Sequence, residues 1–239
     1  MNMGYQQALS FLLEFNKLVK KEDKDSFIFF PPAPLSLIFE KEKFYWGSQN
    51  IYQKIKGALT GENSVQLFKE MGATFCLLGH SERRYIFGET DVDIEKKFSL
   101  VQEQALIPVL CIGESLSERF QKNKVLIKKL SWIKQYNKYE KLPFHPEKLP
   151  PDFKDLSFIV AYEPLWSIGT GEIPSVSELE DVISLIKEDF PTVKVFYGGS
   201  VSLENALSLS CDKLDGFLIG SESVNPHSFY GIYKQIKSC

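Results

Sequence analysis

The feature that most constrains the fold is a regular alternation of short apolar runs with amphipathic or charged segments. The runs at 75–78, 108–112 and 158–162 read FCLL, PVLCI and FIVAY and carry no charged side chain. Continuous apolar runs of this length are expected when the strands of a parallel sheet are buried on both faces. The sequence therefore predicts a parallel α/β protein in which helices connect successive strands.

Seven strands and eight helices are predicted, and a helix comes first. Leu9, Leu12 and Leu13 set the helical period of the first segment. The predicted strands are 26–30, 43–46, 75–78, 108–112, 158–162, 193–197 and 216–219. The predicted helices are 5–20, 34–41, 65–71, 92–104, 115–139, 176–189, 203–209 and 226–236. A complete (β/α)₈ barrel begins with a strand, so one strand is missing from this count.

No shift in composition divides the chain, and we expect residues 1–239 to form a single domain. The segment 142–155 contains four prolines and is predicted to be an irregular insertion, within a stretch at 140–155 whose role the sequence does not give. The rest of the chain follows the strand–helix alternation.

The composition excludes several classes of function. The net charge of −3 offers no basic surface for nucleic acid or for an anionic membrane. The four cysteines and three histidines are scattered, without the spacing of a metal site or a disulfide framework. No apolar run approaches 18 residues, and no signal-peptide pattern opens the chain. We therefore expect a cytoplasmic protein without a metal.

The candidate catalytic stretch is 158–171, which reads FIVAYEPLWSIGTG. Glu163 follows an apolar strand, and Pro164 ends that strand because proline has no N–H for the sheet. Two glycines, Gly169 and Gly171, then close an apolar loop. A carboxylate at a strand end before such a loop favours a catalytic base under a movable lid. The alternative is a strand-end glutamate beside an ordinary turn.

A second candidate residue is His80, which follows the strand 75–78 in the segment GHSERR. A histidine at the start of a helical turn faces unpaired N–H groups, which disfavour the imidazolium. A neutral His80 can donate a hydrogen bond to a substrate carbonyl. A packed structural histidine remains the alternative.

Glycine turns follow the last two strands, at YGGSV (197–201) and GFLIGSESV (216–224). Backbone N–H groups at such turns form an anion-binding nest that needs no lysine. This position is the usual phosphate site of parallel α/β barrels. Ordinary tight turns are the alternative.

Several of these segments together resemble the triosephosphate isomerase family. They are GHSERR (79–84), CIGE (111–114), AYEPLWSIGTG (161–171), YGGSV (197–201) and DGFLIGSES (215–223), and GALTGE (57–62) resembles the dimer loop of that family. The resemblance implies a (β/α)₈ TIM barrel of the α/β class. It also implies a homodimer that interconverts dihydroxyacetone phosphate and D-glyceraldehyde 3-phosphate in glycolysis and gluconeogenesis, through an enediolate and without a cofactor.

The resemblance also implies roles for individual residues. Glu163 resembles the base that moves the proton, and His80 the electrophile that polarises the carbonyl. Thr60 resembles the dimer-loop residue that reaches the partner's pocket. The expected phosphate donors are Gly169, Ser200, Gly220 and Ser221. The expected lid consists of Pro164, Leu165, Trp166, Ser167, Ile168, Gly169, Thr170 and Gly171.

The chain departs from the family pattern at two places. Members of the family begin with a strand that ends in the motif Asn-x-Lys-Met-Asn. Met1 and Asn2 resemble the last two residues of this motif. The resemblance therefore implies that the first strand and the catalytic lysine are absent. We expect the natural start to lie upstream and the isomerase activity of this chain to be low. Ser221 stands where the family has glycine, and a positive φ there would cost about 1 kcal/mol.

The same residues leave two alternatives to an isomerase. A non-catalytic phosphate-binding homologue would keep the barrel without the lysine. A different phosphate-binding barrel enzyme is disfavoured by the match at 162–171. Binding of phosphoglycolate without turnover distinguishes the first alternative from an enzyme.

Overall fold

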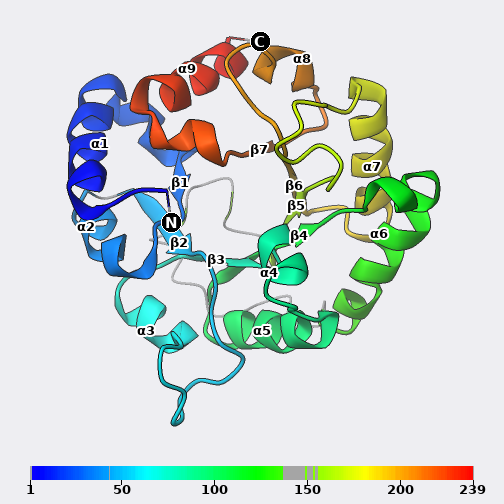
Figure 1. Cartoon of the computed structure of the whole chain (residues 1–239), viewed down its shortest axis with the longest axis horizontal. Helices are drawn as coiled ribbons and strands as arrows, with labels where there is room; N and C mark the ends of the chain where they lie inside the picture. Colours follow the sequence, from blue (N-terminus) through cyan, green and yellow to red (C-terminus); the bar gives the residue numbers. More distant parts are fainter. Residues whose placement is uncertain (1, 43, 137–148, 150–152, 154–155, 239) are drawn as a thin grey trace. The chain divides into compact units, whose positions relative to one another are not determined.

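The computed structural model describes residues 2–42, 44–136, 149, 153 and 156–238 (Figure 1). In these residues the strand order in the sheet is the order of the chain, β1 to β7, and the strand pairs β1–β2, β2–β3, β3–β4 and β6–β7 are parallel. The strands are β1 Ile28–Phe29, β2 Tyr45–Ser48, β3 Phe75–Leu78, β4 Ile107–Ile112, β5 Ile159–Tyr162, β6 Lys194–Gly198 and β7 Gly216–Leu218. The predicted parallel α/β class is confirmed.

Each of the eight predicted helical segments contains an α-helix. The α-helices are α1 Tyr5–Leu18, α2 Ser36–Lys41, α3 Val65–Glu70, α4 Ser81–Tyr85, α5 Asp91–Glu103, α6 Lys122–Leu130, α7 Val176–Asp189, α8 Ala206–Leu209 and α9 Pro226–Lys237. The short helix α4 confirms the helical turn predicted directly after His80. It begins directly after His80, which is its N-cap residue.

The predicted long helix at 115–139 is wrong as a single element. The structure divides its described part into the 3₁₀ helix η3 (Leu116–Gln121), then α6, then the 3₁₀ helix η4 (Ser131–Gln135). At the second boundary the Ser131 hydroxyl donates to the carbonyl of Lys128, three residues earlier. Such a local side-chain bond competes with the α-helical ladder and favours a tighter turn. The predicted insertion at 142–155 lies almost wholly outside the described residues.

The chain forms two compact units. The first consists of Met1–Glu22, Ile112–Ile127 and Val160–Cys239, and the second of Asp23–Cys111 and Lys128–Ile159. The single domain expected from the sequence stays a prediction.

The first unit buries an aromatic contact between its terminal helices. Figure 1 shows α1 (blue) beside α9 (red). Phe15 of α1 is fully buried, and its ring stacks on Phe229 of α9 with centroids 5.6 Å apart. In the same unit Ser175 and Glu178 form a capping box that starts α7.

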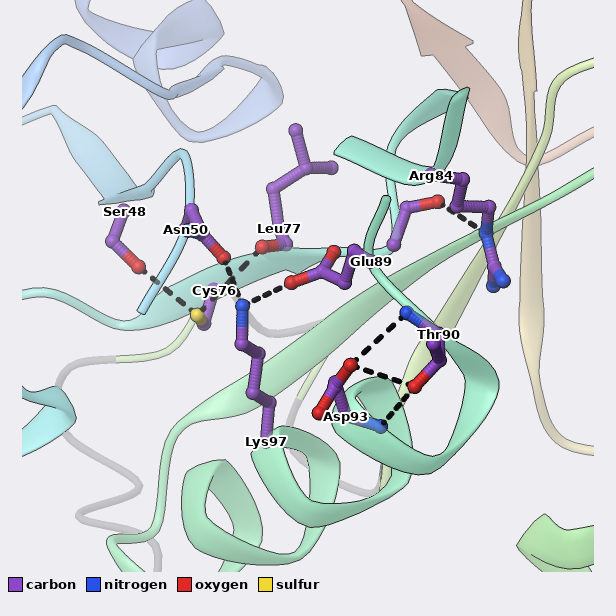
Figure 2. Close-up of polar contacts among 10 residues, drawn as sticks. Ser48, Asn50, Cys76, Leu77, Arg84, Glu89, Thr90, Asp93 and Lys97 are labelled. Atoms are coloured by element: carbon purple, nitrogen blue, oxygen red, sulfur yellow. Dashed lines mark hydrogen bonds and ion pairs between the residues drawn. The ribbon is translucent and has the colours of Figure 1, made fainter. Parts of the chain in front are cut away.

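The second unit contains a buried ion pair, which Figure 2 shows. The Lys97 ammonium on α5 contacts the Glu89 carboxylate and donates to Oδ1 of Asn50 at 2.8 Å. The two charged side chains are only 5% and 3% exposed. The pair therefore ties α5 to the segment before it and to the segment that follows β2.

The buried thiol of Cys76 lies on β3 near this pair. Ser48 Oγ lies 2.9 Å from its sulfur (Figure 2). Burial raises the pKa of the Cys76 thiol to about 12. The thiol is therefore a packing group in the protonated form.

Candidate active site

Glu163 lies in the first unit, directly after β5. Its side chain is buried, with 4% of the residue exposed, and its N–H donates to the Ile112 carbonyl at 2.7 Å. A Cβ added to Gly113 would lie 1.8 Å from the Glu163 carbonyl oxygen, and one added to Gly198 would lie 2.9 Å from Glu163 Cγ. Two glycines thus leave the space that Glu163 occupies, one next to its backbone and one next to its side chain.

The segment 164–171 is a loop with an anchored base and an exposed tip. Its base is held by bonds from Leu165 N to the Glu114 carbonyl and from Ser167 N to the Pro164 carbonyl, both 2.9 Å. Trp166 and Ser167 are buried, whereas Ile168 is 40% exposed. Gly169 has φ of +68°, a conformation that favours glycine. The movement of this loop as a lid stays a prediction.

Glu114 is a fully buried carboxylate beneath this loop. Its Oε1 accepts from the Tyr162 hydroxyl at 3.0 Å and from the Trp166 indole N–H at 2.9 Å. Burial raises the pKa of the Tyr162 phenol, and the Glu114 charge raises it further. The contact ties the base of the loop to the end of β5.

Arg119 was not predicted from the sequence, although it packs on the same loop. Its guanidinium lies 3.8 Å from the centre of the Trp166 ring, and its Nη2 donates to Glu178 Oε1 at 2.8 Å. A backbone bond from Ser175, together with the Arg119 bond, lowers the pKa of Glu178 to about 2. Arg119 and Glu178 are 59 positions apart, so no local sequence pattern predicts their ion pair.

Of the predicted phosphate donors, Ser200, Gly220 and Ser221 follow strands β6 and β7 of the first unit, and Gly169 lies in the loop after β5. Ser200, shortly after β6, donates through Oγ to the Ser167 carbonyl at 2.7 Å, so it contacts the loop directly. Gly220 precedes the 3₁₀ helix η7 (Ser221–Val224), and a Cβ added to Gly220 would meet no atom within 4 Å. The positive φ that would strain Ser221 does not occur. Gly220 makes the turn with φ of −84°, and among the described non-glycine residues positive φ is found at Ala105 and not at Ser221.

His80 lies in the second unit, between β3 and α4. Its Nδ1 accepts the backbone N–H of Glu82 at 3.3 Å. A ring nitrogen that accepts an N–H carries no proton, so this contact assigns the imidazole proton to Nε2. The catalytic role predicted for His80 stays a prediction.

Arg84 holds the turn that carries His80. Its Nε donates to the Gly79 carbonyl at 2.7 Å, which Figure 2 shows, and its Nη2 donates to the Cys111 carbonyl at 3.3 Å. Gly79 has φ of +64°, and a Cβ there would lie 2.9 Å from the Arg84 guanidinium. The arginine therefore fixes the turn from which His80 projects.

Thr60 lies in the exposed loop between β2 and α3, which Figure 1 shows projecting as a long excursion. The neighbouring Gly61 has φ of +94°. In the same unit a continuous apolar stretch is exposed: Tyr85 at 58%, Ile86 at 72% and Phe87 at 65%. Exposed apolar stretches of this kind mark interaction surfaces.

Within the described residues, no cluster of three or more His, Cys, Asp or Glu side chains is placed to hold a metal ion. None of the helices found there has the length and apolarity needed to cross a membrane. In the part of the chain that the structure describes, Cys76, Cys111 and Cys211 form no disulfide.

Parallel strands joined by helices, with Glu163 at the carboxyl end of a strand and a loop beyond it, define the class of α/β-barrel enzymes. The profile of the family described as triosephosphate isomerase matches residues 1–236. The triosephosphate isomerase of Alkaliphilus metalliredigens is 35% identical over 252 residues, which cover 97% of this chain and 94% of the relative.

Other relatives give the same result. The triosephosphate isomerase of Bdellovibrio bacteriovorus is 36% identical over 237 residues, with 94% of this chain and 91% of the relative covered. That of Mesomycoplasma hyopneumoniae strain 232 is 36% identical over 242 residues, with 96% and 93% covered. The chain belongs to the triosephosphate isomerase family, which confirms both the resemblance seen in its motifs and the predicted TIM-barrel fold.

Proposed function

We propose that this chain interconverts dihydroxyacetone phosphate and D-glyceraldehyde 3-phosphate by proton transfer through an enediolate, without a cofactor. The observation that carries the proposal is the buried Glu163 at the end of β5, followed directly by a loop with an exposed tip. The family and the names of the relatives give the substrate.

In this reaction the Glu163 carboxylate removes a proton from one carbon and returns it to the next. A buried carboxylate has few water molecules to displace before it contacts the substrate. His80 donates its Nε2 proton to the substrate oxygens as charge develops there. Its tautomer, set by the bond from Glu82 N, is the one this role requires.

The phosphate is bound by backbone N–H groups of Gly169, Ser200, Gly220 and Ser221. Glycine turns and helix starts are suited to this because their N–H groups are not used by the sheet. The lid, Pro164–Gly171, covers the substrate and excludes water from the enediolate. Ser200 supports this assignment, since its side chain already contacts the lid.

We also propose a homodimer in the cytoplasm. The loop that carries Thr60 and the exposed stretch Tyr85–Phe87 supply the surface of one protomer, with Thr60 reaching toward the partner's site. Among the described residues Cys76 and Cys111 form no disulfide, which fits a reducing compartment.

The test compares isomerisation by the whole chain with that of Glu163→Gln. We expect kcat to fall by about 10²- to 10⁴-fold, because the amide accepts no proton at neutral pH. Glu188→Gln, an exposed carboxylate on α7, is the matched control and should leave kcat unchanged. Equal rates for Glu163→Gln and the parent chain would contradict the proposal.

Binding of 2-phosphoglycolate is measured alongside turnover. Binding without any turnover favours the non-catalytic homologue.

A further inference from the structure

A carboxylate follows directly on the turn after β7 that supplies two of the proposed phosphate donors. Glu222 is the second residue of η7, so it stands next to Ser221 and two positions after Gly220. A carboxylate carries a negative charge at neutral pH, and like charges repel each other. A glutamate at this position therefore opposes the binding of a phosphate group at the turn.

The side chain of Glu222 is bonded to the start of α9. Its Oε2 accepts from the hydroxyl of Ser228, a residue that is only 7% exposed. Ser228 is fixed in turn by Asn225, the N-cap residue of α9, whose Oδ1 accepts the N–H groups of His227 and Ser228 at 3.0 and 3.1 Å. The carboxylate is therefore held against the first turn of α9.

We propose that Glu222 sets how strongly this turn binds phosphate, and that Ser228 keeps the Glu222 carboxylate away from the backbone N–H groups of the turn. We call Glu222 and Ser228 the acidic tether. The proposal rests on the proposed function, because that function places the phosphate group at Gly220 and Ser221. Glu222 is a specificity-determining residue whose charge weakens the binding of a dianion, and Ser228 is the residue that positions it.

The turn at Gly220 is already formed and open to a ligand. The N–H and the hydroxyl of Ser223 both donate to the Gly220 carbonyl, at 3.0 and 2.6 Å, so two bonds close the turn. A Cβ added to Gly220 would meet no atom within 4 Å. The N–H groups of Gly220 and Ser221 make no hydrogen bond to another residue that the structure describes. These N–H groups are therefore available to an anion that comes close to them.

Three other helices of this chain show where a carboxylate in the first turn can bond. Asp93, Glu118 and Glu178 each stand third in their helix, and each accepts the backbone N–H of the residue that caps the helix start, at 2.9 to 3.1 Å. This bond is one half of the capping box. Glu222 stands second in η7, and its side chain is long enough to bond to the N–H groups of its own turn. Its bond to Ser228 removes that competition with a phosphate group.

The experiment measures the binding of inorganic phosphate and of 2-phosphoglycolate to the whole chain, by titration calorimetry at pH 7 and low salt. Glu222→Gln keeps the shape of the side chain and the acceptor for Ser228, and it removes the charge. This variant should bind both ligands roughly 3- to 30-fold more tightly, because a nearby negative charge no longer repels the phosphate. Glu188→Gln, which removes an exposed carboxylate on α7, is the matched control and should leave binding unchanged.

A second variant, Ser228→Ala, tests the bond that holds the carboxylate. The released carboxylate can bond to the turn, so phosphate should bind roughly 3- to 10-fold more weakly than to the parent chain. The same change made in Glu222→Gln should have little effect on binding, since no charge is left to release. Ser238→Ala, which removes an exposed hydroxyl at the other end of α9, is the matched control. Far-UV circular dichroism checks that each variant is folded.

Salt distinguishes an effect of charge from an effect of structure. The gain in Glu222→Gln should shrink as NaCl is raised to about 0.5 M, because salt screens charges near the surface. A gain that arises from a changed shape of the turn would persist at high salt. Parent-like or weaker phosphate binding in Glu222→Gln would overturn the proposal, and so would a gain that salt does not reduce.

These binding measurements need no turnover. A chain without isomerase activity that binds phosphate more tightly after Glu222→Gln would refute the proposed function and leave the acidic tether standing. A parent chain that isomerises triose phosphates, with unchanged phosphate binding in Glu222→Gln, would do the reverse. Absence of phosphate binding in both the parent chain and Glu222→Gln would overturn the acidic tether.

Discussion

The buried pair of Lys97 and Glu89 allows a sharp test of what holds the second unit together. In Lys97→Met the Glu89 carboxylate, whose side chain is 3% exposed, loses its cation. Its Oε2 has no hydrogen-bond partner among the described residues, and Asn50 would lose the Lys97 donor as well. Removing one partner of a buried ion pair typically costs about 3–5 kcal/mol. That is a large share of the roughly 5–15 kcal/mol by which folded proteins are stable.

The assay is urea denaturation followed by far-UV circular dichroism at pH 7 and 25 °C. We expect Lys97→Met to lower the free energy of unfolding by about 3–5 kcal/mol. The double variant Lys97→Met/Glu89→Gln should recover much of this loss, because it leaves no uncompensated charge. Lys96→Met, an exposed neighbour on α5, is the matched control and should change stability by less than about 0.5 kcal/mol.

Two results would refute the reasoning. One is a loss below about 1 kcal/mol in Lys97→Met, which would mean that water or another group compensates Glu89. The other is a double variant as unstable as the sum of the two single changes. That outcome would show that packing of the side chains, rather than their charges, carries the effect.

Three further predictions concern other parts of the chain. Gly113→Ala should destabilise the protein by about 3 kcal/mol or more, measured by thermal unfolding, because its Cβ would lie 1.8 Å from the Glu163 backbone oxygen; a parent-like Tm would contradict this. Glu178→Gln should cost roughly 1 kcal/mol at pH 7, since its carboxylate is 36% exposed and screened. The pKa of Glu178, lowered to about 2, means that its carboxylate stabilises the fold above about pH 4.5. The stability lost in Glu178→Gln should therefore vanish as the pH falls toward 2. A loss that does not change with pH would argue against a role of the charge. Cys211 should react with a thiol reagent in the native protein while Cys76 does not, as peptide mapping can show, because Cys76 is buried with a pKa of about 12; equal labelling would be the contrary result.

The sequence predicts the strands well where an apolar run ends at glycine or proline. The strand before Glu163 is an example, because it is an apolar run and Pro164 stops it. These are local signals that depend on backbone chemistry. Local bonds also explain one failure, since the bond from Ser131 to Lys128 tightens a segment whose charge pattern fits a single helix.

The sequence does not predict the contacts between residues that are far apart in the chain. Lys97 and Asn50 are 47 positions apart, and no periodicity relates them. The sequence also did not give the backbone angles at Gly220 and Ser221. The resemblance gives the residue types at that turn, whereas the negative φ of Gly220 follows from the packing around the turn.

The glycines beside Glu163 separate two ways in which this protein can fail. A change of Glu163 to glutamine keeps the shape of the side chain, so the chain can lose its chemistry and remain folded. A single methyl at Gly113 instead intrudes on backbone atoms and acts on folding itself. A natural variant can therefore be inactive for two different reasons. Thermal unfolding is enough to distinguish a folded protein that has lost its catalytic group from a protein that does not fold.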